Sequence, residues 1–283
     1  MQLYYFQSST GHQNFGDDLN PWLWERLLPE MFNDDDSETF VGIGTLLNDK
    51  IPEFNKYVVF SSGVGYASDI PTVDDNWKIY CVRGPKSAAA LGLEPSYAIT
   101  DGGALVHRVY TQKHAKKFAK SYMPHVTSNH QYWRRVCVDL GINYIDPTKG
   151  TEEILQQLVE TEVLYTEAMH GAIIADALRT PWVPVVTTHK ILDFKWHDWC
   201  ESMELAYAPY QLPAIWDVAS LNPLVHVKRW AKIRLAKSRF TAILDEAKPV
   251  LSRDDVLEER CQRLEERLEQ FKQDVANGAL WKR

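Results

Sequence analysis

The sequence has few cysteines and no excess of basic residues, and both shortages narrow the possible functions. Its four cysteines lie far apart and form no CxxC pair, at Cys81, Cys137, Cys200 and Cys261. This spacing argues against a zinc site and a disulfide framework, so we expect reduced thiols and no bound metal. The 31 basic and 38 acidic residues give a net charge of −7, which excludes broad nucleic-acid binding through phosphate neutralisation.

Long apolar runs are also missing. The chain has no stretch of about 18 uncharged apolar residues, the length that a membrane-spanning helix needs. Its first residues, MQLYYFQSS, lack the basic start and apolar core of a signal peptide. We therefore expect a cytoplasmic protein that does not span a membrane. The 283 residues, 45% of them hydrophobic, are enough for two domains with full cores.

Short apolar segments alternate with helical patterns and glycine-bearing loops along most of the chain. The segments that we predict to be strands are 3–6, 41–43, 58–60, 79–82, 99, 118–123, 143–145, 163–165 and 182–186. This alternation predicts the α/β class with parallel, doubly wound sheets. Several of the loops at the strand ends carry glycine, which lets a ligand approach the backbone.

A polar stretch around residues 108–120 indicates a boundary between two such sheets. We expect two Rossmann-like domains that face a cleft in a GT-B-like arrangement, at residues 1–115 and 116–225. Residues 226–283 are expected to form a helical C-terminal extension.

The segment VLYTEAMHGAIIADALRTPWVPVV, residues 163–186, predicts a β-α-β unit with His170 between the first strand and the helix. Ligands of open parallel sheets bind at the carboxyl ends of strands, where helix N-termini favour anions. Gly171 leaves the backbone beside His170 open to a ligand. The alternative is that His170 merely caps the helix, a position where Ser, Thr, Asp or Asn is more common. We therefore favour an anionic substrate at His170.

The sequence pattern of the C-terminal region predicts two helices, each with apolar residues whose packing partner the sequence does not identify. Residues 227–243 combine an apolar stripe with many basic residues and no acidic one. This stretch either lies on an anionic membrane surface or packs back on the first domain. The apolar residues of 257–275 then alternate in steps of four and three, typical of a short a/d seam. Residues 226–275 are therefore candidates for a peripheral membrane contact or for a homo-oligomer contact.

Five motifs together resemble the polysaccharide pyruvyl transferases, in particular the succinoglycan-type members that form ketals. They are NFGDDLN, GIGTLL, VRGPKSAAALG, MPHVTSNHQ and the His-Gly helix followed by TPWVPV. The resemblance covers roughly residues 1–200. It implies a two-domain enzyme that transfers a pyruvyl group from phosphoenolpyruvate, as co-substrate, to two hydroxyls of one sugar. Phosphate is released, no other cofactor is needed, and the acceptor is a lipid-linked oligosaccharide at the inner face of the plasma membrane.

The chain departs from that family at one position. Many members carry an arginine two residues before the histidine, whereas this sequence has Ala168 there. The cation that holds the carboxylate of phosphoenolpyruvate is then expected elsewhere. Arg83 is favoured because it ends a strand and because guanidinium pairs bidentately with carboxylate or phosphate. The other candidates are Lys86, Arg179, Lys190 and Lys195.

Ketal formation requires proton transfers, and histidine titrates near neutrality, so we expect His170 to be the general acid. Asp17, which follows Gly16, is expected to be the acceptor of the sugar hydroxyl proton, with Asp18 beside it. Asn14 is expected to orient a sugar hydroxyl or the donor. For the two aspartates, charge compensation at a helix N-terminus is nearly as good an explanation.

The remaining candidates contact substrate in this interpretation. They are Gly16, Gly44, His125 as a phosphate ligand, Gly171, and Trp196 as a platform for the pyranose ring. Core packing explains a tryptophan such as Trp196 equally well. Two other functions stay open: a GT-B glycosyltransferase that uses a nucleotide sugar, and a non-catalytic component of a polysaccharide-synthesis complex.

Overall fold

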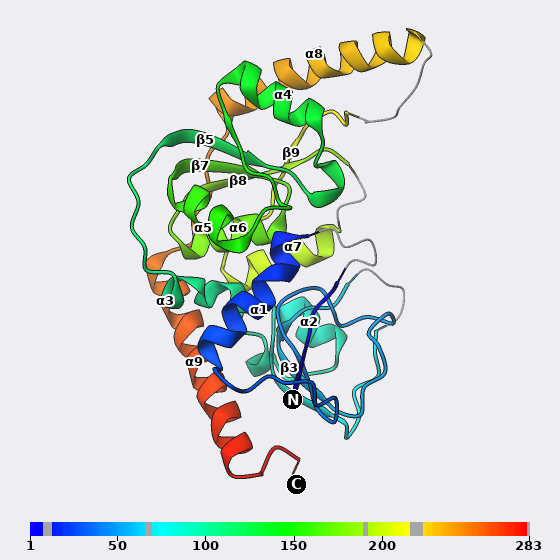
Figure 1. Ribbon diagram of the computed structural model, residues 1–283, viewed down its shortest axis with the longest axis vertical. Helices are drawn as coiled ribbons and strands as arrows, with labels where there is room; N and C mark the ends of the chain where they lie inside the picture. The colour runs from blue at the N-terminus through cyan, green and yellow to red at the C-terminus, as the bar shows by residue number, and fades with distance from the viewer. Residues whose placement is uncertain (8–12, 66–69, 189–191, 216–222, 282–283) are drawn as a thin grey trace. The chain divides into compact units, whose positions relative to one another are not determined.

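The computed structural model describes residues 1–7, 13–65, 70–188, 192–215 and 223–281 (Figure 1). The chain divides into two compact units, each assembled from separate stretches of sequence. Unit 1 contains Met1–Thr111, Leu192–Tyr207 and Ser252–Arg283, and unit 2 contains Gln112–Ile191 and Ala208–Leu251. This division differs from the predicted ranges 1–115, 116–225 and 226–283, because two later segments return to unit 1.

Unit 1 is built on a four-stranded parallel sheet in the order β1-β2-β3-β4. Its strands are β1 (Gln2–Tyr4), β2 (Thr39–Val41), β3 (Tyr57–Ser62) and β4 (Trp77–Val82). Its helices are α1 (Phe15–Leu27), α2 (Pro85–Ala90), η1 (Pro95–Tyr97), η2 (Gly102–Leu105), α3 (Val106–Val109), α7 (Asp193–Ser202) and α9 (Asp254–Ala276). Residue 99 forms no strand, contrary to the prediction, because only Ala98 makes an isolated bridge, to Val82.

The sequence predicts a loop at residues 14–20 followed by a helix with Pro21 in its first turn, since proline favours that position, and the structure differs. The helix begins at Phe15, so Pro21 lies in its second turn and the acidic pair Asp17 and Asp18 is helical. Pro21 has no N–H to donate to the carbonyl of Asp17. The side chain of Asn20 compensates, since its Nδ2 donates to that carbonyl at 3.2 Å. A proline is thus accommodated inside the helix.

The seam predicted on the C-terminal helix is used within unit 1. Leu264, Leu268 and Phe271 of α9 are buried. The Phe271 ring lies 5.5 Å from that of Phe40 on β2, and α9 contacts β4. These apolar side chains therefore cover the unit's own core, and this stripe does not serve as the partner contact that the heptad spacing suggested.

Unit 2 is built on a five-stranded parallel sheet in the order β6-β5-β7-β8-β9. Its strands are β5 (Phe118–Met123), β6 (Asn143–Tyr144), β7 (Thr161–Thr166), β8 (Trp182–Val186) and β9 (Tyr210–Gln211). Its helices are η3 (Val126–Ser128), α4 (Gln131–Leu140), α5 (Thr151–Val159), α6 (Met169–Ala177) and α8 (Pro223–Glu246). Counted along the unit, the strand order is 2-1-3-4-5, one of the common doubly wound orders. Both units are therefore α/β with parallel sheets, as predicted.

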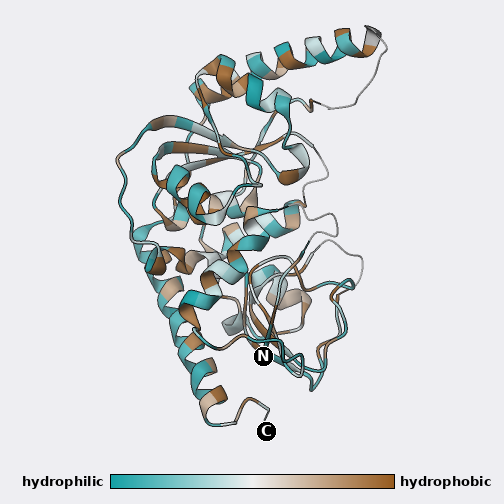
Figure 2. Ribbon diagram, viewed as in Figure 1, coloured by the Kyte–Doolittle hydropathy of each residue, from teal (hydrophilic) through white to brown (hydrophobic). Residues whose placement is uncertain are grey.

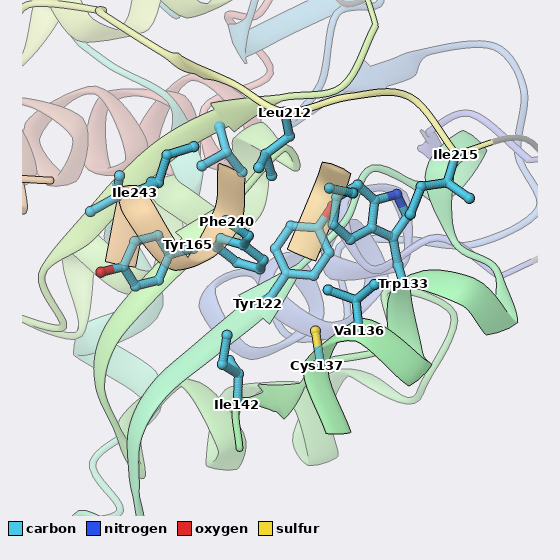
Figure 3. Packing of buried hydrophobic residues seen from close by; sticks show 13 residues of the cluster. Tyr122, Trp133, Val136, Cys137, Ile142, Tyr165, Leu212, Ile215, Phe240 and Ile243 are labelled. Atoms are coloured by element: carbon cyan, nitrogen blue, oxygen red, sulfur yellow. The ribbon is translucent and has the colours of Figure 1, made fainter. Parts of the chain in front are cut away.

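The buried hydrophobic cluster of unit 2 contains four aromatic rings among its aliphatic side chains (Figure 3). Phe240 of α8 packs against Tyr122 of β5 at 5.3 Å and against Tyr165 of β7 at 5.7 Å between ring centroids. Trp133 of α4 closes the cluster, 5.3 Å from Tyr122. Helix α8 thus packs on unit 2, and not on the first domain, which was one of the two alternatives for its stripe. Only the C-terminal part of the stripe, with Phe240 and Ile243, is buried.

Candidate functional site

The strand order of unit 2 identifies the edge where a ligand is expected. Strand β5 has β6 on one side and β7 on the other, so successive connections leave β5 and β7 in opposite directions. In parallel sheets a ligand crevice forms at the carboxyl ends of the strands that flank such a reversal. Met123, the last residue of β5, pairs with Thr166, the last of β7. The segments that follow these residues carry His125 and His170 to the same edge of the sheet.

A buried carboxyl group, Glu167, joins the loops at this edge. It accepts a hydrogen bond from the backbone N–H of Thr187 at 2.6 Å and one from the backbone N–H of His125 at 3.3 Å. The Tyr122 hydroxyl donates to the same carboxyl at 3.3 Å. Burial raises the pKa of Glu167, and the hydrogen bonds from Thr187, His125 and Ser128 oppose that rise. Three loops are therefore tied to one side chain.

His170 lies in the first turn of α6, which begins at Met169, two residues earlier than Gly171, the predicted start of the helix. The Thr166 hydroxyl shapes the turn into α6, because it donates to the carbonyl of Ala168 and accepts from its N–H. Gly171 is required by space. A Cβ there would lie 2.8 Å from Met123 Sδ and from Thr166 Oγ1. The absence of a side chain lets α6 start directly over β5 and β7, with His170 half-buried.

His125 precedes the short helix η3 and is also half-buried. Its Nδ1 accepts from the backbone N–H of Thr127 at 3.3 Å and lies 2.8 Å from the Thr127 hydroxyl. A backbone N–H can only donate, so in the neutral ring Nε2 carries the proton. The loop after β5 thus holds one imidazole in a defined orientation.

In unit 1, the predicted polar residues gather at the N-terminus of α1. Asn14 Nδ2 donates to the Asp17 carboxylate at 2.6 Å, and the N–H of Asn14 donates to the Asp18 carboxylate at 3.1 Å. Burial raises the pKa of Asp18, and the hydrogen bond from Asn14 opposes the shift. Gly16 is buried between them in the first turn. These contacts support the charge-compensation interpretation, and they also hold both carboxylates at the carboxyl edge of β1.

Sequence reasoning missed Asn20, the residue that connects α1 to the loop after β2. The Asn20 side chain donates to the carbonyl of Ile43 at 2.9 Å and accepts from its N–H at 2.7 Å. Gly44 follows with a φ of +135°, a conformation that favours glycine. Its carbonyl accepts from the N–H of Gly63 at 2.9 Å. The sequence feature that could have indicated this role is an asparagine within one helical turn of the acidic pair.

Arg83 is fully buried, and each guanidinium nitrogen has a protein partner. Its Nε pairs with Asp198 of α7 at 3.1 Å, its Nη1 donates to Thr45, and its Nη2 donates to the carbonyl of Val64. The Asp198 carboxylate also accepts from the backbone and hydroxyl of Ser87. The structure therefore does not support Arg83 as the ligand of a substrate carboxylate. It fixes α7 to the edge of the sheet instead.

Two further predicted residues lie after β8. Trp196 of α7 is 1% exposed, and Tyr207 stacks on its ring at 4.9 Å. The ring is part of the core of unit 1, so the prediction of a sugar platform at Trp196 is not supported. Lys190 lies outside the described residues. Of the predicted residues, His125, His170 and Gly171 meet in unit 2, and Asn14, Gly16, Asp17, Asp18 and Gly44 lie at the strand ends of unit 1.

Comparison with known proteins identifies the family. Residues 14–189 match the polysaccharide pyruvyl transferase family. The chain belongs to this family. It is also similar to the succinoglycan biosynthesis protein ExoV of Rhizobium meliloti (strain 1021), with 38% identity over 218 residues. That alignment covers 75% of this chain and 68% of ExoV.

The matched segment of this pyruvyl transferase family member begins at Asn14 and ends just after β8. It includes every predicted site residue except Lys190, Lys195 and Trp196. The buried Glu167, which sequence reasoning passed over, also lies within it. The segment matched to the family therefore contains the strand ends, in both units, where these residues lie.

Proposed function

We propose that this protein transfers the enolpyruvyl carbons of phosphoenolpyruvate to two hydroxyls of a terminal sugar in an exopolysaccharide repeat unit. The products are a pyruvate ketal and inorganic phosphate. One observation carries the proposal: within the segment matched to the pyruvyl transferases, His170 occupies a helix N-terminus at the reversal of the unit 2 sheet. Such a position favours an anionic substrate beside a group suited to proton transfer.

The reaction balances with two proton movements. A proton is added to the methylene carbon of phosphoenolpyruvate, which becomes the methyl group of the ketal. One sugar hydroxyl forms a C–O bond to the adjacent carbon, and the second does so as the C–O bond to phosphate breaks. The two hydroxyl protons replace the one given to the methylene carbon and the one carried off by phosphate.

In this scheme His170 is the general acid for the methylene carbon. It lies in the first turn of α6, whose N-terminal N–H groups and dipole favour the anionic donor. His125, on the loop after β5, is placed to donate from Nε2 to a phosphate oxygen. Glu167 contributes by holding both loops through the N–H groups of His125 and Thr187.

For unit 1 we propose that Asp17 accepts a proton from a sugar hydroxyl. Asn14 already donates to Asp17, so the amide fixes the orientation of that carboxylate. Asp18 has a different task, because it accepts from the N–H of Asn14 and stabilises the start of α1. Gly16 and Gly44 provide backbone without side chains next to these groups.

The donor carboxylate still needs a cation, since Ala168 stands where many family members have arginine. Arg83 is committed to Asp198. Among the other candidates we propose Lys190, which is close in sequence to the end of β8.

The acceptor and the arrangement of the domains are also proposals. ExoV is named for succinoglycan biosynthesis, which supports an exopolysaccharide substrate for this chain, and we propose a lipid-linked oligosaccharide as acceptor. The parallel sheet in each unit supports a pair of Rossmann-like domains of the GT-B-like kind. No described residue favours a nucleotide-sugar glycosyltransferase or a catalytically silent component over this reaction.

The test is an assay with phosphoenolpyruvate and a synthetic glycoside that carries a free pair of hydroxyls. We expect phosphate release that depends on the glycoside, together with a ketal methyl signal in the proton NMR spectrum of the product. A nucleotide sugar replaces phosphoenolpyruvate in the control. Glycoside-dependent turnover with the nucleotide sugar alone would overturn the proposal.

A further inference from the structure

Helix α8 carries exposed apolar side chains on the face opposite the core. Ala236, Phe240 and Ile243 are buried in unit 2. Val227, Trp230 and Leu235 are 62%, 57% and 59% exposed. At 100° per residue, these three lie within one sector of the helix, turned away from the buried side. The N-terminal part of α8, in yellow, extends beyond α4 in Figure 1.

The same stretch of α8 is strongly basic. Between residues 225 and 244 the sequence has no acidic residue, although the whole chain has a net charge of −7. Its basic residues are Lys228, Arg229, Lys232, Arg234, Lys237 and Arg239. Figure 2 shows hydrophilic and hydrophobic turns mixed along the helix. The exposed apolar sector is therefore bordered by positive charge.

The basic residues of α8 differ in their contacts. Arg229 is half-buried and donates to the hydroxyl of Tyr132 at 2.7 Å. Toward the C-terminus, Lys237 pairs with Asp139 and Arg239 pairs with Glu246. Toward the N-terminus, the guanidinium of Arg234 lies 4.7 Å above the ring of Trp230, and both are exposed. The N-terminal part thus presents an aromatic ring and a cation together at the surface.

We propose that residues 225–235 of α8 are a docking surface for a bilayer that contains anionic lipids. Tryptophan prefers the headgroup region, arginine and lysine reach phosphates from there, and an amphipathic helix lies flat at that depth. In the described part of the chain no helix has the length and apolar character to cross a bilayer.

Charge decides between a bilayer and a second copy of the chain. A two-fold symmetric contact through this surface would bring the same basic residues of both copies together, and like charges across an interface repel. Nucleic acid would satisfy the charge but would leave Trp230, Leu235 and Val227 without an apolar environment. A bilayer with anionic lipids provides both negative charge for the basic residues and an apolar environment for the exposed apolar side chains. The inference does not rest on the transferase reaction, because vesicle binding is measured without substrate.

The experiment is co-sedimentation of the full chain with vesicles of phosphatidylcholine, with or without one quarter phosphatidylglycerol. We expect binding only to the anionic vesicles, weakened at about 0.5 M salt, where screening is strong. Trp230→Ser/Leu235→Ser is expected to lower the partition coefficient by about tenfold or more. Lys228→Glu/Arg234→Glu is expected to lower it by roughly thirtyfold or more, since each basic residue near such a surface contributes about fivefold and each new glutamate is repelled by it.

Matched controls come from positions outside α8: Phe6, Lys50 and Ile70 lie in unit 1, and Lys113 lies in unit 2. Phe6→Ser/Ile70→Ser removes one aromatic and one aliphatic residue of similar exposure, and Lys50→Glu/Lys113→Glu changes two exposed charges away from α8. Both are expected to bind like the unchanged protein. Thermal unfolding of each variant checks that the fold is intact.

Three results would overturn the proposal: no binding to anionic vesicles, equal binding by Trp230→Ser/Leu235→Ser, or equal binding to neutral vesicles. Light scattering adds a fourth. A dimer that Trp230→Ser/Leu235→Ser converts to a monomer would identify a second copy as the occupant instead.

Discussion

The backbone N–H of Thr187 donates a 2.6 Å hydrogen bond to the carboxyl group of Glu167. Thr187 directly follows β8 and Glu167 directly follows β7, so one contact joins the ends of two strands. The N–H of His125, after β5, adds a third strand end. Glu167 is fully buried, so the shape of the candidate site depends on an ionisable group that is not exposed to solvent.

Glu167→Gln is expected to change the pH dependence of stability. The pKa of Glu167 is raised by burial above its usual value of about 4.5, so the folded state holds this proton more tightly than the unfolded chain. The stabilisation that the protonated carboxyl contributes is fully present below the pKa of the unfolded chain. It is lost as pH rises through the pKa of the folded state. The unchanged protein should therefore lose stability relative to Glu167→Gln as pH rises from about 4 to 7. Urea unfolding at several pH values measures the difference, and a constant difference would contradict the argument.

Gly171→Ala is expected to destabilise the protein by about 1–3 kcal/mol, because the new Cβ overlaps Met123 and Thr166. The displaced α6 should also lower pyruvyl transfer, since His170 moves with it. Gly150→Ala is the matched control, because no atom lies within 4 Å of a Cβ at Gly150. Its effect on the free energy of unfolding should stay within about 0.5 kcal/mol. Equal effects of the two substitutions would show that α6 tolerates a shift.

Asp198→Asn is expected to cost about 3–5 kcal/mol of stability, because it leaves the buried Arg83 guanidinium without its anionic partner. Arg83→Met/Asp198→Leu should cost less than the sum of the single changes Arg83→Met and Asp198→Leu, since no unpaired charge remains in the double variant. Chemical unfolding of the four proteins gives the coupling energy. Arg83→Lys provides the functional comparison. A large rise in KM for phosphoenolpyruvate at unchanged stability would restore Arg83 as a substrate ligand.

His170→Gln is expected to lower kcat for ketal formation by about 10²–10⁴-fold, the usual contribution of a general acid. Calorimetry should show that phosphoenolpyruvate still binds, because the N–H groups of α6 remain. His197→Gln, at an exposed position of α7, is the control and should keep full activity. Full turnover by His170→Gln would remove this histidine from the proton transfers.

The sequence predicted local structure well where a single segment carries the signal. The apolar runs at 118–123 and 182–186 are strands with the bounds that we expected. The sequence placed the start of α1 too late, because a proline usually lies in the first turn of a helix. Here Asn20 compensates for the missing N–H of Pro21, so the helix begins earlier. The site at His170 was expected for a local reason too, since a strand end and a helix N-terminus are adjacent in the chain.

Contacts between distant segments could not be predicted in the same way. Nothing near Arg83 in sequence indicates that α7, more than a hundred residues later, supplies Asp198. The a/d spacing of α9 is compatible with a partner helix or with the unit's own sheet, and the burial of Phe271 against Phe40 decides for the sheet. The role of Glu167 was hidden because its donors are distant in sequence: Tyr122 is in β5, His125 is in the loop after β5, and Thr187 follows β8.

By itself the sequence determined the α/β class, the position of most strands, and the presence of a histidine at a strand-to-helix junction, because periodicity and turn residues act over a few positions. Tertiary structure alone decided which polar groups are buried with partners and which apolar side chains stay exposed. Burial depends on segments that meet only after folding, so Arg83 became a structural ion pair while Trp230 was left at the surface.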